Sequence, residues 1–297
     1  MSNKFILNAD DFGMSYAFNR AILEGFNDGF LKSASLVANG EAYDDAIKRI
    51  IPNCNNQGGA LGVGIHLNII EGYSLCNDLS ELTDDSGKFN NSWGKILLKS
   101  LNTKYDTFME QVEKEFRTQI EKVQKDKHIT HIDSHVHVHA IPKIFELVCR
   151  LAKEYGIPQI RTQFERPYII PDIFIHLNKK YYINLIKLII LNIFTLINEN
   201  KVKQYNLKTN DYLIGVTYTS LMNSLAVSCG LMAIDYENIT VEALIHPCRY
   251  DDGTIDNHFV EFQITKNKKL KDKIEKLGYV ITNYIENEQI ENNHNAL

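Results

Sequence analysis

Five apolar runs of strand length are spread along the chain: 4–8, 33–38, 61–69, 157–162 and 241–245. Runs of this kind predict buried strands. Apolar residues recur at helical spacing over 107–123, and helices are also predicted over 15–29, 43–51 and 142–156. Strands that alternate with helices favour a parallel sheet or a barrel of the α/β class. No linker interrupts the pattern, so we expect one domain over 1–297, a length that α/β barrels reach.

The segment 131–139 breaks the apolar pattern, because it reads HIDSHVHVH. Successive side chains of a strand point to opposite faces, so a strand here places five ionisable residues on one face: His131, Asp133, His135, His137 and His139. Each of them needs a partner if it is buried. The pattern indicates a polar site that holds a metal. One metal cannot bind all five, so Asp133, His137 and His139 are expected to orient the ligands or to contact a substrate.

Further polar residues stand where other predicted strands end. Asp10 and Asp11 follow the first strand, His66 lies in the third, and His246 precedes Pro247 after the last. The carboxyl ends of barrel strands meet at one face of the fold. We therefore expect these residues and His135 to line one cavity.

This combination of residues suits metal-assisted hydrolysis. Asp11, His66 and His135 form a candidate set of one carboxylate and two imidazoles, which leaves positions on a metal for water and substrate. Asp10 is the candidate general base. His246 is a candidate proton donor to the leaving group, and Arg161 could orient Asp10 or stabilise an oxyanion.

Each of these residues also has a simpler interpretation. The two aspartates could cap a helix, His66 could be a buried histidine with ordinary hydrogen bonds, and His246 could be a turn residue. The histidine segment at 131–139 is the part of the pattern that a structural role explains least well.

Composition narrows the class of protein. The chain is 44% hydrophobic and 23% charged, with a net charge of −5. It has no basic stripe, so nucleic-acid binding is not expected. The five cysteines are scattered without a CxxC pair, and no secretory signal follows Met1, so we expect a cytoplasmic protein with free thiols.

The segment 181–198 is strongly apolar, but Asn184, Lys187, Asn192, Thr195 and Asn198 fall on one helical face. It predicts an amphipathic helix within an insertion near 176–200. This helix could pack on the barrel or form a homodimer contact. It could also be a lid or a peripheral membrane element that admits a lipid-linked substrate. The polar tail near 285–297 is expected to be loose.

Four segments together resemble the YdjC-like carbohydrate deacetylases, which include the chitooligosaccharide deacetylases. They are Asn8-Ala9-Asp10-Asp11-Phe12-Gly13, the His66 strand, the segment 131–139 and His246-Pro247, in the same order and at similar spacing, and the resemblance runs from residue 5 to about residue 284. It implies a distorted, TIM-like (β/α) barrel related to polysaccharide deacetylases. It also implies removal of an N-acetyl group from an amino sugar.

The resemblance further implies one divalent metal on Asp11, His66 and His135, with Asp10 as the base and His246 and Arg161 in supporting roles. The family is usually described with Mg²⁺. Two imidazoles and one carboxylate suit Zn²⁺ or another transition metal better, so both remain open.

Two other functions compete with an N-deacetylase. Alternating histidines also occur in metal-dependent phosphoesterases of barrel type, although no Arg/Lys cluster or glycine-rich loop is visible to hold a phosphate. A non-catalytic, sugar-binding barrel is the third interpretation. The candidate base Asp10 argues against it, because a structural metal needs no base.

Overall fold

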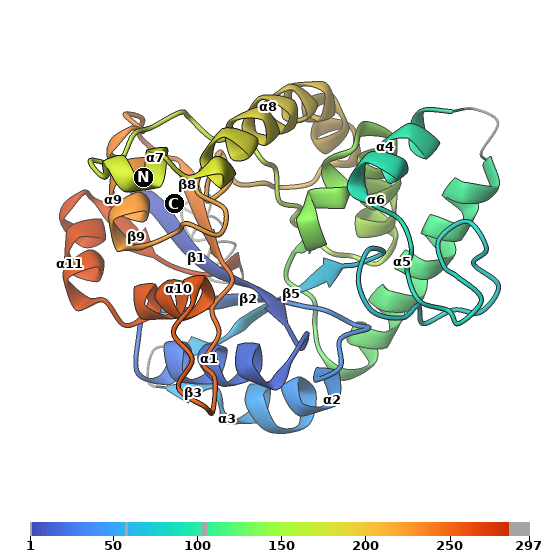
Figure 1. The fold of residues 1–297 in the computed structure, drawn as a ribbon, viewed down its shortest axis with the longest axis horizontal. Coiled ribbons are helices and arrows are strands. Elements are labelled where there is room, and N and C mark those ends of the chain that lie inside the picture. The colour runs from blue at the N-terminus through green and yellow to red at the C-terminus, as the bar shows by residue number, and fades with distance from the viewer. Residues whose placement is uncertain (1, 57–58, 103–105, 285–297) are drawn as a thin grey trace, which may run out of the picture.

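The computed structural model describes residues 2–56, 59–102 and 106–284, and it is built around one parallel sheet (Figure 1). The sheet has seven strands in the order β6-β5-β2-β1-β8-β7, with β9 also paired to β1. Its strands are β1 Asn3–Phe12, β2 Ser33–Leu36, β5 Gly62–Leu67, β6 Ile132–Ser134, β7 Tyr212–Ile214, β8 Thr240–Ile245 and β9 Tyr279–Ile281. A small antiparallel pair, β3 Asn55–Asn56 and β4 Gly59–Ala60, lies outside it.

The sheet curls until its two edges approach each other through irregular backbone. Ile160 forms an isolated parallel bridge with Ile132 of β6, and Gln159 forms another with Lys208. Leu213 of β7 donates its N–H to the carbonyl of Phe164. These bonds link β6 to β7, so the expected distorted α/β barrel is confirmed. The predicted strand at 157–162 is reduced to these bridges.

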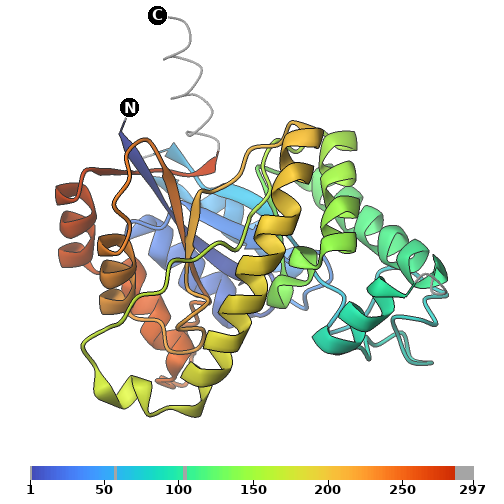
Figure 2. The ribbon, with the colours of Figure 1, turned by 90° about the horizontal axis from the view of Figure 1, so that it is seen from above.

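Helices cover the outside of the curled sheet (Figure 2). The longer helices are α1 Tyr16–Asn27, α4 Trp93–Leu101, α5 Asp106–Asp126, α6 Pro142–Glu154, α8 Lys179–Tyr205, α9 Ser224–Met232, α10 Asn257–Thr265 and α11 Lys268–Lys276. The shorter elements are α2 Tyr43–Asp45, η1 Ala46–Ile50, α3 Ile51–Asn53, η2 His135–Ala140 and α7 Ile173–His176.

The predicted helical spacing over 107–123 is confirmed by α5. Its residues Phe108, Val112, Phe116, Ile120 and Val123 are all fully buried. Burying one apolar stripe in this way is what fixes an amphipathic helix to a core. The helix expected over 181–198 is also present, and α8 extends beyond it at both ends. The tail at 285–297 lies outside the described residues.

Candidate active site

Two consecutive aspartates at the end of β1 direct their side chains to different partners. Asp11 has a φ of 62°, in the left-handed region that non-glycine residues seldom adopt. The pairing of β1 with β2 shifts between Ala9 and Phe12, which marks the same irregularity. Asp11 contacts His66 and His135, whereas Asp10 binds Arg161. Because of this break in the strand, the two neighbouring carboxylates point to different partners: Asp11 to the histidines and Asp10 to Arg161.

Asp11, His66 and His135 lie together at the carboxyl ends of their strands. Each offers one ligand atom, and these atoms are all within 4.8 Å of one another. Asp11 Oδ1 is 2.9 Å from His135 Nδ1 and 3.4 Å from His66 Nε2. His135 Nε2 is buried and has no hydrogen-bond partner among the described residues, and a carboxylate oxygen of Glu71 lies 3.5 Å from it. The set is therefore compact enough to hold a metal ion.

The charges around this set also suit a cation. Burial opposes protonation of His66, but the carboxylates of Asp133, Asp10 and Asp11 outweigh it and raise the pKa of His66 to about 10. Burial likewise opposes protonation of His135, but Asp11 outweighs it and raises the pKa of His135 to about 9. Acidic groups therefore converge on both rings, and such surroundings favour a positive charge. Because a metal binds neutral imidazole, a bound cation would take the place of a proton on these rings.

A second group, Asp10, His66 and Asp133, meets the same distance criterion. Here the positive charge is already supplied, because Arg161 lies 2.7 Å from both aspartates. Asp133 Oδ1 also accepts a hydrogen bond from His66 Nδ1 at 2.7 Å. This contact fixes the ring so that Nε2 faces Asp11, which is how carboxylates orient histidine ligands. The set with Asp11 and His135 is the better candidate for the metal.

Arg161 is the centre of a buried ionic network. Its guanidinium donates to both oxygens of Asp10 at 2.7 Å and, through Nε at 2.8 Å, to Glu242 of β8. The side chain is fully buried, so these carboxylates compensate for its desolvation. The network holds Asp10 in one orientation.

His246 follows β8 at the rim of the site, with its side chain 22% exposed. Its backbone N–H donates to Glu261 of α10 at 2.5 Å, and its ring Nδ1 lies 3.4 Å from the same carboxylate oxygen. Burial opposes protonation of the ring, but Glu261 outweighs it and raises the pKa of His246. The ring therefore binds its proton more tightly than a free imidazole, and His246 stays a candidate proton donor.

Comparisons with known proteins agree with this architecture. A model of the family described as YdjC-like protein matches residues 4–276. The chain belongs to the YdjC-like family. Relatives named carbohydrate deacetylase include one from Clostridium beijerinckii at 39% identity and one from Brevibacillus brevis at 36%, each aligned over 156 residues. These alignments cover 52% of this chain and 58% of each relative, so the chain matches little more than half the length of those proteins.

A solved structure from Enterococcus faecalis V583, whose name refers to cellobiose-phosphate cleavage, is also similar. It has a TM-score of 0.69 and covers 96% of this chain and 99% of that chain at 20% identity. At this level of identity the likeness shows the fold alone.

The prediction of a strand over 131–139 in this YdjC-like chain is wrong beyond Ser134. β6 ends there, and the chain enters tight 3-10 turns in which Val136 and His137 have positive φ. Ser134 folds the turn back, because its Oγ accepts the N–H of His139 at 2.8 Å and pairs with that residue's Nδ1 at 2.5 Å. Strand alternation therefore does not place these histidines on one face.

The histidines of this segment consequently have different surroundings. His131 stacks on Tyr284 at 4.0 Å and pairs with Ser35, so it belongs to the barrel interior. Gly64 makes room for it, since a Cβ there would lie 2.3 Å from the ring. His139 contacts the carbonyl of Arg161 and supports the turn. His137 is buried, its Nδ1 has no hydrogen-bond partner in the part of the chain that the structure describes, and it remains a candidate substrate contact.

Sequence reasoning missed three groups around the site. Glu242 is the one acid within an apolar strand, and that position is the signal that could have revealed it. Glu261 and Ser35 have no such signal, because only the fold brings them to His246 and Asp133. Lys187 is a different case, because the sequence placed it on the polar face of 181–198 without a role at the site. It donates to Thr219 Oγ1 at 3.4 Å, and burial lowers its pKa to about 8.

Proposed function

We propose that this chain removes the N-acetyl group of an amino sugar in a metal-dependent hydrolysis. The supporting observation is the placement of Asp11, His66 and His135 as a compact donor set directly beside the Asp10–Arg161 pair. The relatives named carbohydrate deacetylase support the class of substrate. One divalent ion bound at this set would polarise the acetyl carbonyl and lower the pKa of the attacking water.

The protein's own groups account for the proton transfers. Asp10 accepts the proton that water loses as its oxygen bonds to the acetyl carbon. Asp10 Oδ1 accepts hydrogen bonds from Arg161 and Asn8, whereas Oδ2 accepts one from Arg161 and keeps a second lone pair for this proton. His246 donates its proton to the sugar nitrogen as the carbon–nitrogen bond breaks. The products are acetate and the free amine.

The donor chemistry bears on the metal. Two imidazoles and one carboxylate are the ligands of many catalytic zinc sites, whereas Mg²⁺ prefers oxygen ligands. We propose one divalent ion at this set and expect Zn²⁺ or Co²⁺ to support turnover at least as well as Mg²⁺.

The test is acetate release from N-acetylglucosamine oligomers by metal-stripped protein, before and after addition of Mg²⁺, Zn²⁺ or Co²⁺. We expect acetate release only with metal. Phosphate release from sugar phosphates, with no acetate from any N-acetyl sugar, would instead support a phosphoesterase. The contacts of Arg161 argue against that outcome. Its guanidinium already binds the carboxylates of Asp10, Asp133 and Glu242, so it is not available to bind a phosphate.

A further inference from the structure

Helix α8 has the opposite polarity from a helix on the surface of a protein in water. Three asparagines in its middle part face the barrel and donate to backbone carbonyls there. Asn184 donates to Thr219 O at 3.0 Å, Asn192 to Glu165 O at 2.9 Å and Asn198 to Ala140 O at 2.8 Å. The polar face predicted from the sequence is therefore the attached side of the helix.

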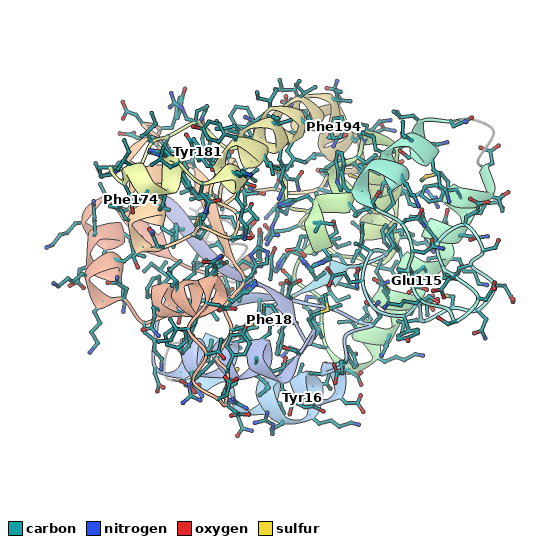
Figure 3. The ribbon with its side chains drawn as sticks, viewed as in Figure 1. Tyr16, Phe18, Glu115, Phe174, Tyr181 and Phe194 are labelled. Atoms are coloured by element: carbon teal, nitrogen blue, oxygen red, sulfur yellow. The ribbon has the colours of Figure 1, made fainter. Side chains whose placement is uncertain are left out.

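The opposite side of α8 exposes large apolar residues. Each of the following is more than half exposed: Tyr182, Ile183, Ile186, Ile189, Ile193, Leu196 and Ile197. At about 100° per residue they fall within one arc of roughly 140°. Phe174 on the adjoining α7 and Leu177 directly after it are 81% and 69% exposed. We call these nine residues the outer face. Figure 3 labels Phe174 of this face, and also Tyr181 and Phe194 of α8, which are partly buried against the core.

An exposed apolar surface of this extent marks an interaction site. α8 is long and apolar enough to cross a membrane by length and composition. Its attached side excludes a span, because Asn184, Asn198 and Leu188 are buried against the rest of the protein. A helix that is attached along one side and apolar along the other can lie flat on a lipid surface.

Charge favours a lipid surface that is anionic. The whole chain carries a net charge of −5, yet 173–198 contains no aspartate or glutamate. It carries Lys179, Lys180 and Lys187, and the first two are exposed at the start of α8. Apolar residues beside lysines are the composition of helices that bind anionic bilayers.

The outer face also continues into a cavity beside the candidate active site. This cavity, of about 360 Å³, is lined by Trp93, Val136, Ile183, Ile186, Lys187, Ile190 and Leu191. Val136 stands between His135 and His137 in the chain. A second copy of the protein bound to the outer face would cover Ile183 and Ile186, which line this cavity. A lipid surface in the same place would instead offer acyl chains to the cavity.

We propose that the outer face of α7 and α8 binds the surface of an anionic membrane. The candidate active site then works next to the bilayer. This proposal goes beyond the proposed function and is independent of it, because membrane binding is measured without turnover.

The test is flotation of the full chain with vesicles of phosphatidylcholine, alone or with phosphatidylglycerol. We expect binding that is stronger with phosphatidylglycerol. The double variant Ile189→Glu/Ile193→Glu should lose about tenfold or more in vesicle partitioning, since two isoleucines leave the lipid and two carboxylates meet an anionic surface. Neither residue lines the cavity. Ile255→Glu is the matched control, because Ile255 is 75% exposed and lies between β8 and α10, outside the outer face. This variant should bind vesicles like wild type.

Lysines give a second comparison. Lys179→Glu/Lys180→Glu should weaken binding to phosphatidylglycerol vesicles, whereas Lys268→Glu/Lys269→Glu on α11 should not. Thermal melting confirms that each variant is folded, and light scattering after gel filtration gives the oligomeric state. The proposal is overturned if wild type does not bind vesicles or if Ile189→Glu/Ile193→Glu binds them equally well. It is also overturned if wild type is a dimer that this variant converts to a monomer without any vesicle binding.

Discussion

Replacing Asp10 by asparagine tests the proton-accepting role that the ionic network assigns to it. The change keeps the shape of the side chain and removes its charge. Arg161 loses one carboxylate but retains Asp133 and Glu242. Loss of hydrogen bonds to a charged group costs about 1.5–3 kcal/mol. For a domain of this size that lowers the melting temperature by roughly 3–12 °C, so the protein stays folded at room temperature.

The effect on turnover should be far larger than the effect on stability. Removal of a general base typically costs about 10²–10⁴-fold in rate. We expect a fall of this size in kcat, measured as acetate release, with metal content unchanged because Asp11, His66 and His135 are intact.

Glu242→Gln is the matched control for this experiment. It also removes one carboxylate from Arg161, but Glu242 belongs to neither of the donor groups around His66. Its melting temperature should fall by a similar amount while kcat stays within about tenfold of wild type. If Asp10→Asn turned over substrate normally, or if both variants lost the same activity, Asp10 would not be the base.

Three further changes test the remaining parts of the site. His135→Ala should lose the metal, as measured by elemental analysis, and full occupancy in that variant would refute the ligand set. Asp133→Asn should weaken metal affinity by about 10–100-fold in a chelator competition, because His66 loses its orienting carboxylate. An unchanged affinity would mean that Asp133 does not orient His66 for the metal and only binds Arg161. His246→Gln should lower kcat by about 10²-fold or more with the metal retained, and a normal pH profile with normal kcat would exclude it as the proton donor.

The main features of the fold were predictable because they depend on local pattern. Buried parallel strands are short apolar runs, and α5 shows its buried stripe in the sequence. The closing edge at 157–162 was not predictable in detail. Its backbone pairs through isolated bridges whose partners lie far away along the chain, and an apolar run alone does not distinguish such a segment from a regular strand.

The candidate site shows the same division. The residues themselves could be named from the sequence, since acids and histidines at strand ends converge in a barrel. Their individual environments could not. The period of two fails at Ser134 because a side chain caps the turn, and only the folded chain separates His135 from His139. For α8, the polar face was visible in the sequence, but the structure was needed to show that this face is turned inward.

The most direct test of the account is a titration of metal-free protein with Zn²⁺ or Co²⁺. At each step, acetate release from an N-acetylglucosamine oligomer and the metal content of the protein are measured. We predict that activity rises in proportion to bound metal and reaches its limit at one ion per chain, and that His135→Ala remains inactive throughout. Full acetate release by the metal-free protein would contradict the central claim that Asp11, His66 and His135 hold the ion on which the reaction depends.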